Sequence, residues 1–324
     1  MLFNQLKMKQ SAEELAALGV YVGTSSWKYP GWRGLLYDES KYLWRGKVAE
    51  SRFEKNCLSE YAEVFKTVCV DAAYYTFPSE KYLAGLVGQV PADFRFGFKV
   101  TDEITVKRFP HHARFGARAG AVNENFLNAD LFARAFLGPC TTIRSFVGVV
   151  MFEFSRFYPA DYAQGRDFVA DLDRFLGQLP AGWPYAIEFR NRGWLTAEYF
   201  ECLRRHQVAH VFNSWEAMPS VTEQMALPNS RTNPELVAAR FLLQPGRKYE
   251  DAVKTFQPYQ LLREVNDDAR KAGAQLLVEG QRHEPRRKTY IYVNNRLEGN
   301  ALGTISAMVE LARLILGRTE VSNP

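Results

Sequence analysis

The sequence predicts a single α/β domain with the (β/α)8 TIM-barrel fold. Eight strand-like segments, which begin near residues 20, 67, 94, 146, 185, 208, 237 and 289, are separated mostly by helix-like segments. Alternating strands and helices are typical of parallel sheets with right-handed crossovers. The length of 324 residues suits such a barrel, which usually has about 250 residues plus insertions. A doubly wound open sheet is the alternative, but no G-x-G-x-x-G or G-x-x-x-x-G-K motif opens a helix.

Four strands and four helices are expected in the first half of the chain. A capping-box pattern at Ser11 and Glu14 predicts a short helix that Gly19 ends. Strands are predicted at 20–25, 67–71, 94–100 and 146–154, and the last is apolar enough to be buried on both faces. Amphipathic patterns predict helices at 51–65, 79–87 and 123–137. A long basic loop is expected around 107–118, and such loops inside compact domains are functional or mobile.

The second half of the chain contains the other four strands, at 185–189, 208–213, 237–243 and 289–295. Helices are predicted at 166–178, 196–206, 256–272 and 302–316, and Gly317 is expected to stop the last one. The segment 275–279 fits either a short strand or a helical turn. These elements divide the chain into an N-terminal helical extension (1–19), the barrel domain (20–316) and a tail (317–324).

Composition and charge indicate a soluble globular protein. Hydrophobic residues make up 47% and charged residues 24% of the chain, and the net charge of +5 is compatible with an anionic ligand. The cysteines at 57, 69, 140 and 202 lack C-x-x-C spacing, so we expect reduced thiols in a cytoplasmic protein rather than disulfides or a zinc site. Residues 1–10 lack the apolar core of a signal peptide. No apolar run approaches the roughly 18 residues of a membrane span.

The strand at 185–189 carries the first candidate site residues. Side chains two positions apart share a face of a strand, so Glu188 and Arg190 point the same way. A buried charge must be paired, because an unpaired one is very costly. Two interpretations follow, a buried ion pair that ties the strand to its neighbours, or a ligand-binding or catalytic pair.

In a TIM barrel the active site lies at the carboxyl ends of the strands, so polar residues at those ends are informative. The carboxylates there, as candidate catalytic groups, are Asp71, Glu153 and Glu188. The candidate substrate-binding residues are Lys99, Arg190, Arg240, Asn294 and Asn295, with the aromatic residues Trp27, Trp32, Tyr74 and Trp194 as walls. Each of these can alternatively be structural, as a hydrogen-bonding group at the barrel end or as rim packing.

Some kinds of chemistry agree with these residues better than others. Glu153 and Glu188 could act as paired carboxylates in acid–base chemistry, as in a hydrolase. Lys99 and Arg190 could equally neutralise these acids and hold an anion. A hard cation held by Asp71, Glu153 and Glu188 is a further alternative. A histidine metal site is not supported, because His206 and His210 span a helix-to-strand junction instead of sharing a helix face. We therefore expect neither metal nor cofactor.

Several motifs together resemble the YecE-like family of uncharacterised TIM-barrel proteins. The segment 23–34, Gly-Thr-Ser-Ser-Trp-Lys-Tyr-Pro-Gly-Trp-Arg-Gly, is similar to the opening signature of that family. Phe94-Arg95-Phe96 with Lys99, Glu188-Phe189-Arg190 with Gly193-Trp194, and Asn294-Asn295 with Gly299 and Ala301 follow in the family's order and spacing. The resemblance covers about residues 20–315. It implies the barrel fold and a polar pocket at the strand ends, without supplying a reaction.

The chain also departs from the pattern of this family. Cys69 and Asp71 stand where the family usually has Glu and Asn, and Val106, Glu153 and Gln244 stand where it usually has His, Gln and His. Six positions keep the pattern, namely Trp27, Lys99, Glu188, Arg190, Trp194 and Asn294.

The leading hypothesis is a pocket for a small, polar and anionic ligand, such as a sugar phosphate or nucleotide. Glu188 would be the acid–base or orienting carboxylate, Arg190 and Lys99 would bind the anion, and tryptophans would form the walls. A second hypothesis is nucleic-acid binding or processing through the basic segments 107–118 and 282–288. A third is a non-catalytic ligand sensor. No membrane partner is expected.

Overall fold

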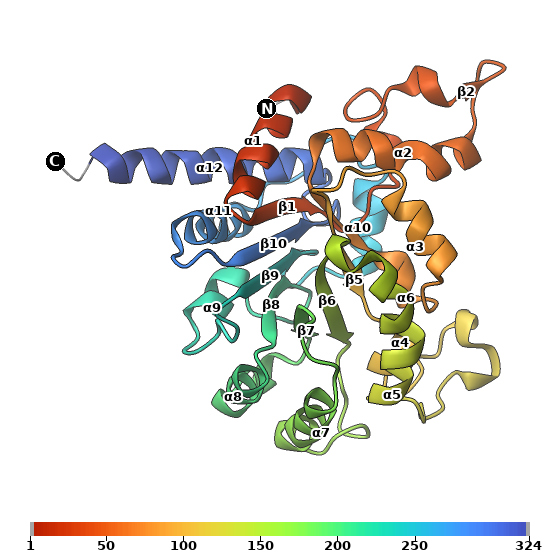
Figure 1. Ribbon diagram of the computed structural model, residues 1–324, viewed down its shortest axis with the longest axis vertical. Coiled ribbons are helices and arrows are strands. Elements are labelled where there is room, and N and C mark those ends of the chain that lie inside the picture. Colours follow the sequence, from red (N-terminus) through yellow and green to blue (C-terminus); the bar gives the residue numbers. More distant parts are fainter. Residues whose placement is uncertain (1–2, 322–324) are drawn as a thin grey trace.

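The computed structural model describes residues 3–321 and confirms the TIM-barrel prediction (Figure 1). Eight strands close into a barrel in the order β1-β10-β9-β8-β7-β6-β5-β4, and each pair of neighbours is parallel. Thr24 of β1 pairs with Val68 of β4 and thereby completes the ring. Residues 322–324 of the expected tail and residues 1–2 of the expected extension lie outside the described residues.

The barrel strands lie close to their predicted positions. They are β1 Val20–Thr24, β4 Thr67–Val70, β5 Arg95–Lys99, β6 Val147–Phe154, β7 Tyr185–Phe189, β8 Ala209–Ser214, β9 Leu236–Phe241 and β10 Lys288–Val293. Two short strands that were not predicted, β2 Leu43–Trp44 and β3 Lys47–Val48, form an antiparallel hairpin between β1 and the next helix. This hairpin segment projects from the barrel (Figure 1).

Helices surround the barrel. The α-helices are α1 Gln5–Ala17, α2 Glu50–Val64, α3 Glu80–Val87, α4 Asp102–Thr105, α5 Ala129–Leu131, α6 Gly138–Cys140, α7 Gly165–Gly177, α8 Ala197–Arg205, α9 Val221–Ala226, α10 Tyr249–Phe256, α11 Asp267–Arg282 and α12 Ala301–Val321. The 3₁₀ turns are η1 Pro30–Trp32, η2 Glu39–Tyr42, η3 Asp71–Tyr74, η4 Ala113–Arg118, η6 Thr141–Phe146 and η7 Arg192–Trp194, and η5 Phe132–Leu137 is a π-helical turn. Within residues 3–321, none of the helices combines the length and apolarity that a bilayer span requires.

Two predicted helix starts are wrong. In both cases the helix begins after an asparagine whose side chain caps its first turn. The first helix begins at Gln5, since the Asn4 side chain accepts a hydrogen bond from the Lys7 backbone N–H. Ser11, the predicted cap, lies inside this helix. The helix expected at 123–137 begins only at Ala129, where the Asn128 side chain caps it. A polar side chain that bonds the free N–H groups of a first turn sets the start of a helix.

The helix predicted at 256–272 is also wrong. The chain forms two helices instead, α10 and α11, and Pro258 stands between them after a cis peptide bond with Gln257. Proline lacks the N–H that a helix interior needs. The segment 275–279, for which strand and helix were both open, lies in α11. Gly317 does not end the last helix, because α12 continues to Val321.

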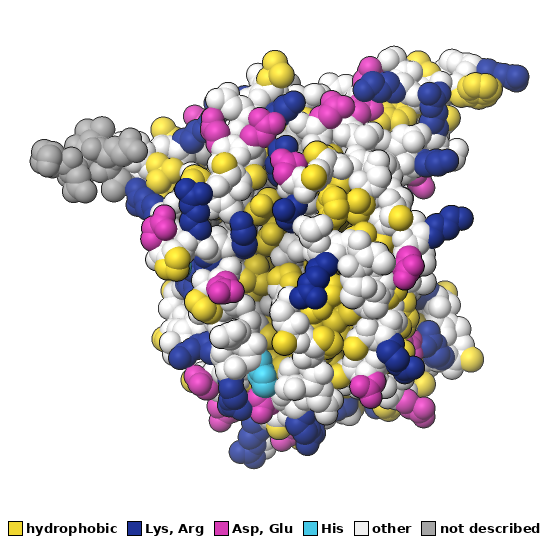
Figure 2. All heavy atoms as spheres, in the orientation of Figure 1, with side chains coloured by type: hydrophobic (Ala, Val, Ile, Leu, Met, Phe, Trp, Pro, Cys, Tyr) yellow, Lys and Arg dark blue, Asp and Glu magenta, His cyan; other side chains and the backbone are white. Residues whose placement is uncertain are grey.

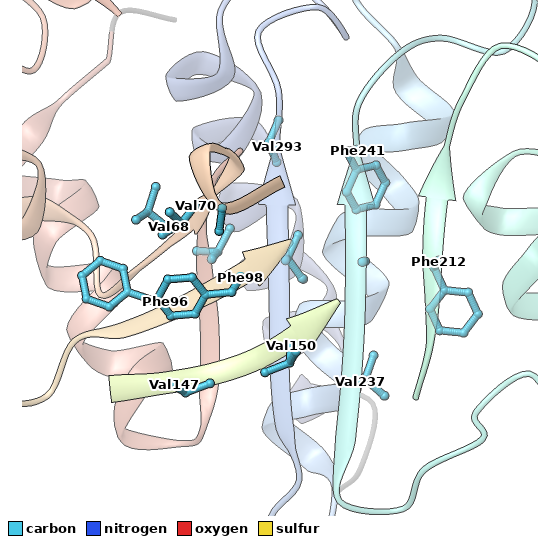
Figure 3. Close-up of a cluster of buried hydrophobic side chains, with 14 of the residues drawn as sticks. Val68, Val70, Phe96, Phe98, Val147, Val150, Phe212, Val237, Phe241 and Val293 are labelled. Atoms are coloured by element: carbon cyan, nitrogen blue, oxygen red, sulfur yellow. The ribbon is translucent and has the colours of Figure 1, made fainter. Parts of the chain in front are cut away.

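The hydrophobic core has two layers on the two faces of the strands. The outer layer fills the space between barrel and helices; Figure 3 shows part of it, including Val68, Phe96, Phe98 and Phe241. The inner layer fills the barrel with Tyr21, Cys69, Val149, Met151, Ala186, Ala209, Val211, Leu236, Ala238, Tyr290 and Tyr292. Side chains alternate along a strand, so every second residue points into the barrel. The inward residues that follow this inner layer therefore lie at the carboxyl ends of the strands.

Tyrosines of β10 inside the barrel are accommodated by glycines on β5 and β6, across the barrel. A methyl group added at Gly97 would lie 2.4 Å from the Tyr292 hydroxyl, and one added at Gly148 would lie 2.6 Å from the Tyr290 ring. The hydroxyl of Tyr292 forms a 3.2 Å hydrogen bond with the side chain of Thr67. Large and small side chains therefore interlock in the lower half of the barrel.

We expect Gly97→Ala to destabilise the fold by about 1–3 kcal/mol, because the added methyl group overpacks the barrel against Tyr292. Gly85→Ala is the matched control, since its added Cβ meets nothing within 4 Å on the exposed face of α3. That control should be neutral or stabilising by up to about 1 kcal/mol. Urea denaturation of both variants measures these values, and equal unfolding free energies would contradict the interlocking of Gly97 and Tyr292.

Candidate functional site

Six charged side chains converge at the carboxyl ends of the strands. β5 ends at Lys99, β6 and β7 present Glu153 and Glu188 at their last inward positions, and Arg240 projects inward from β9. Arg190 follows β7 directly, and Asp71 follows β4 as the first residue of η3. We call this set the charge cluster and this end of the barrel the mouth. The members of the charge cluster are Asp71, Lys99, Glu153, Glu188, Arg190 and Arg240.

Glu153 is the centre of the charge cluster. One of its oxygens, Oε2, lies 2.6 Å from Nζ of Lys99, 3.0 Å from Nη2 of Arg190 and 3.1 Å from Nη1 of Arg240. The residue is only 3% exposed, so these interactions are shielded from solvent. Three cations on one buried oxygen form a strong charge-assisted network.

Glu188, on β7 beside Glu153 of β6, contacts the two arginines of the charge cluster. Its Oε1 accepts hydrogen bonds from Nε (3.2 Å) and Nη2 (3.0 Å) of Arg190, and its Oε2 accepts one from Nη1 of Arg240. The side chain of Glu188 is fully buried. The charge cluster has three carboxylates and three cations, so its formal charge is zero. This balance compensates for the desolvation of charges inside the barrel.

Electrostatics keep Glu153 ionised. Burial by itself would raise the pKa of Glu153, but the charges of Arg190, Lys99 and Arg240 outweigh burial and hold this pKa well below its usual range. Burial likewise favours neutral Lys99, yet Glu153 and Asp71 raise the pKa of its ammonium group. At neutral pH these groups are therefore charged. A proton donor is not among the roles that Glu153 can fill.

Asp71 is the most exposed member of the charge cluster. Its side chain is 33% exposed, whereas those of Lys99 and Arg190 are 10% exposed. Asp71 is also the least tightly held, since Nη2 of Arg240 lies 3.4 Å away and the Cys69 thiol 3.8 Å away. This carboxylate is therefore the member of the charge cluster that is most accessible from solvent.

Two aromatic rings flank the cations. Nζ of Lys99 lies 3.9 Å from the ring centroid of Tyr74, and Cζ of Arg190 lies 3.8 Å from the ring centroid of Trp215. Cations over aromatic faces are attracted by the ring quadrupole. The sequence also places Trp215 at this end of the barrel, since it directly follows Ser214 at the end of β8, although it was not among the chosen substrate-binding residues. Its place at a strand end was the available signal.

The structure does not bring the other predicted residues into the charge cluster. Trp32 is fully buried and packs against Tyr29 and Tyr37. Trp194 stacks on Phe157 and Phe168, in the outer layer. Trp32 therefore belongs to the core, and Trp194 is partly buried against it.

Trp27, Asn294 and Asn295 lie at the barrel end but serve the local backbone. The carbonyl of Trp27 accepts a hydrogen bond from the hydroxyl of Tyr37. Asn294 accepts from the backbone N–H of Arg296 at 3.0 Å, and Asn295 accepts from that of Ala301 at 2.7 Å. These asparagines shape the loop between β10 and α12.

That loop carries a cation that the sequence reasoning missed. The guanidinium of Arg296 lies 4.6 Å from the ring centroid of Tyr249, and its buried Nε has no hydrogen-bond partner among the described residues. Burial raises the pKa of the Tyr29 hydroxyl. The charge of Arg296 lowers this pKa, and the charge of Asp71 raises it. Arg296 and Asp71 therefore both lie within electrostatic reach of Tyr29. Its only signal in the sequence is its position two residues after Asn294.

The carboxylates of the charge cluster are already neutralised, which leaves the hard-cation alternative without support. In the described part of the chain, the side chains that could hold a metal ion together are Asp173, Cys202 and His206. These residues lie outside the barrel, on α7 and at the end of α8.

The fold and the charge cluster define a TIM-barrel protein with a charge-balanced site at its strand ends. Residues 21–322 match the family described as "Protein of unknown function DUF72", and the chain belongs to this family. The YecE-like family is the DUF72 family, so the resemblance in the motifs is confirmed.

Solved structures agree with this assignment at the level of the fold. A DUF72 family protein from Enterococcus faecalis V583 is 20% identical, with 91% of this chain and 95% of that chain covered and a TM-score of 0.60. A DUF72 family protein from Thermotoga maritima MSB8 is also 20% identical, with coverages of 91% and 98% and a TM-score of 0.57. A search of curated proteins found no match.

The ionised Glu153 gives the fold a predictable response to acid. Its folded-state pKa lies below the value of about 4.3 for an unfolded chain, so its charge stabilises the fold fully above roughly pH 5. This contribution is lost as the pH falls toward the folded-state pKa. We expect Glu153→Gln to reduce the pH slope of the unfolding free energy between about pH 3 and 5 by up to about 1.4 kcal/mol per pH unit.

Urea denaturation at several pH values measures this slope. Glu124→Gln is the matched control, because Glu124 is an exposed glutamate outside the charge cluster. The control should keep the slope of the unchanged protein. An equal slope in Glu153→Gln would show that Glu153 titrates alike in the folded and unfolded chains.

Proposed function

We propose that the mouth of the barrel binds a small ligand with an anionic group and a ring, such as a sugar phosphate or a nucleotide, and acts on it enzymatically. The observation that carries the proposal is the charge cluster itself. It places preorganised cations beside an accessible carboxylate, at the end of the barrel where active sites of this fold lie.

The anionic group would meet Arg190 and Lys99. The contacts of Arg190 use Nε and Nη2, so its Nη1 edge is available to a ligand. The ammonium of Lys99 has three donors, of which Glu153 needs one. Glu153 and Glu188 then serve as orienting groups, which hold the cations in fixed positions while the ligand supplies the additional negative charge.

The ring of the ligand would stack on the aromatic faces of the mouth. Trp215 is partly exposed and lies 6.5 Å from the exposed Tyr249, measured between ring centroids. Sugar rings and nucleobases both bind to such faces. The two rings therefore favour a ligand with a flat or apolar face over inorganic phosphate.

Proton transfer would fall to Asp71, because the other two carboxylates are occupied by cations. Asp71 alone combines partial exposure with a single long ion pair, at 3.4 Å to Arg240. General acid–base catalysis needs a carboxyl group that reaches the ligand directly or through one water molecule. Hydrolysis of the ligand is the reaction class that fits a carboxylate next to an anion-binding group.

Nucleic-acid binding through the basic segment 107–118 is a weaker alternative. Arg114 is paired with Asp102 at 2.6 Å, and Arg118 with Glu103 at 2.8 Å. The ammonium of Lys107 lies 3.3 Å from the ring centroid of Tyr162. On the face shown in Figure 2, basic and acidic side chains are interspersed, without one continuous basic area. These cations have partners already and would have to leave them to bind phosphates.

The state of the cysteines is informative about the cellular compartment of the protein. Cys57, Cys69, Cys140 and Cys202 are all free and buried. Free thiols are typical of proteins in reducing compartments. We propose that the protein works in the cytoplasm.

We expect a sugar phosphate or nucleotide to raise the melting temperature of the purified protein, since a ligand at about 100 times its dissociation constant adds roughly 2.7 kcal/mol. The thermal-shift panel contains sugars, sugar phosphates, nucleotides, short oligonucleotides and inorganic phosphate. Arg190→Gln should abolish the shift. Asp71→Asn should keep the shift but lose turnover of the same ligand, whereas Asp251→Asn, on the exposed side of α10, should keep both.

Each other outcome supports a different function. A saturable shift without product in the unchanged protein would indicate a sensor instead of an enzyme. A response to oligonucleotides alone that falls steeply with salt would support nucleic-acid binding. If no ligand shifts the protein and Arg190→Gln is about 3–5 kcal/mol less stable, the charge cluster is a structural ion-pair network.

A further inference from the structure

A second group of chemically active side chains lies outside the barrel, between α7 and α8. Cys202 and His206 are four residues apart, so they share one face at the end of α8. Asp173 projects toward them from α7. One ligand-type atom from each residue, namely a sulfur, a nitrogen and an oxygen, lies within 4.8 Å of the other two.

The three side chains converge on one point. Nε2 of His206 lies 2.8 Å and Sγ of Cys202 lies 3.8 Å from the same oxygen, Oδ1 of Asp173. Around a tetrahedral zinc ion, ligand atoms at 2.0–2.3 Å from the metal are separated by roughly 3.3–3.7 Å. Small adjustments of the side chains thus turn this arrangement into three corners of a zinc tetrahedron.

The geometry is unlike that of a catalytic Cys-His-Asp relay. In a relay the histidine lies between the nucleophile and the carboxylate and uses a different nitrogen for each. Here Cys202 and His206 both point at Asp173 Oδ1, and Cys202 is only 1% exposed. Both side chains contact the carboxylate directly, so the sulfur, the nitrogen and the oxygen lie together as ligands of one metal ion do.

We propose that Asp173, Cys202 and His206 form a zinc-binding site that joins α7 to α8. Imidazole, thiolate and carboxylate are the usual protein ligands of Zn²⁺. On binding, the thiol proton of Cys202 is released to solvent, and the sulfur bonds the metal.

The surroundings leave room for a fourth ligand and support the carboxylate. A surface groove of about 290 Å³ is lined by Asp173, Cys202 and also Glu198, which is one helical turn before Cys202 on the same face of α8. Water or Glu198 can occupy the open position from this groove. Nη1 of Arg205 lies 2.9 Å from Oδ1 and 3.0 Å from Oδ2 of Asp173. Metal binding therefore requires the guanidinium to move off Oδ1, and it can then hold the carboxylate through Oδ2.

The zinc site would brace the part of the barrel that carries the charge cluster. α7 follows β6 and α8 follows β7, the strands of Glu153 and Glu188, and these helices contact each other (Figure 1). A metal that binds only the folded chain adds to its stability by mass action. The proposal does not depend on the proposed function of the mouth.

Titration of the metal-free full-length protein with Co²⁺ and Zn²⁺ tests the site. We expect one cobalt ion per chain with a near-ultraviolet thiolate-to-cobalt band, displacement of cobalt by zinc, and a higher melting temperature with zinc. Cys202→Ser should abolish the band, and Asp173→Asn or His206→Gln should weaken zinc binding by at least about tenfold. Cys140→Ser is the control, a buried thiol on α6 that should leave the band intact.

Circular dichroism of each variant verifies that it folds, and Asp173→Asn, with a partly exposed side chain, provides a test that does not alter the buried thiol. A thiolate band that survives Cys202→Ser would overturn the proposal. So would binding that fails to saturate at one ion per chain, or zinc affinity that is equal in Asp173→Asn and the unchanged protein.

Discussion

The mutual neutralisation of six charges at the mouth is the interaction on which this structure depends. Buried carboxylates and guanidinium groups are costly to desolvate unless each has a partner in good geometry. The partners come from five strands or strand ends, so the charge cluster forms only when the strands are in register. Glu153 and Glu188 are directly paired positions of β6 and β7, and Arg240 opposes Asn213 across β8 and β9. Barrel closure and charge compensation therefore require each other.

The inside of the barrel changes from apolar to charged along the strands. Below the charge cluster, stacked Tyr21 and Tyr290 fill the space, and Tyr292 fills the space that Gly97 leaves open. This packed lower half excludes water from one side of the charges. In a medium of low polarity, ion pairs are stronger and unpaired polar groups are more costly. The tyrosine layer thus determines how rigidly the arginines and the lysine are held.

The fold could be predicted from the sequence because its signal repeats along the chain. Eight strand-like segments that alternate mostly with helix-like segments outweigh the local errors at Ser11 and Pro258, where an asparagine cap and a proline decided the helix ends. The spacing of Glu188 and Arg190 also predicted one shared face correctly. Their partners could not be predicted, because the pairing depends on which strands meet across the barrel. The packing of Trp32 and Trp194 against other aromatic side chains could not be predicted for a related reason: an aromatic residue in a loop can pack into the core as readily as it can line a site.

The zero formal charge of the charge cluster also affects how strongly the mouth attracts simple ions. Exposed groups of like charge collect ambient counter-ions, whereas a balanced set produces little long-range potential. A simple anion that approaches Arg190 gains attraction from the guanidinium and meets repulsion from Glu153 and Glu188, which lie 3.0 Å from its Nη2. Entry thus amounts to a partner exchange, in which the incoming group must match the geometry of the carboxylate that it replaces or joins. Under the proposed function, such a mouth would favour molecules whose shape completes this exchange over simple anions.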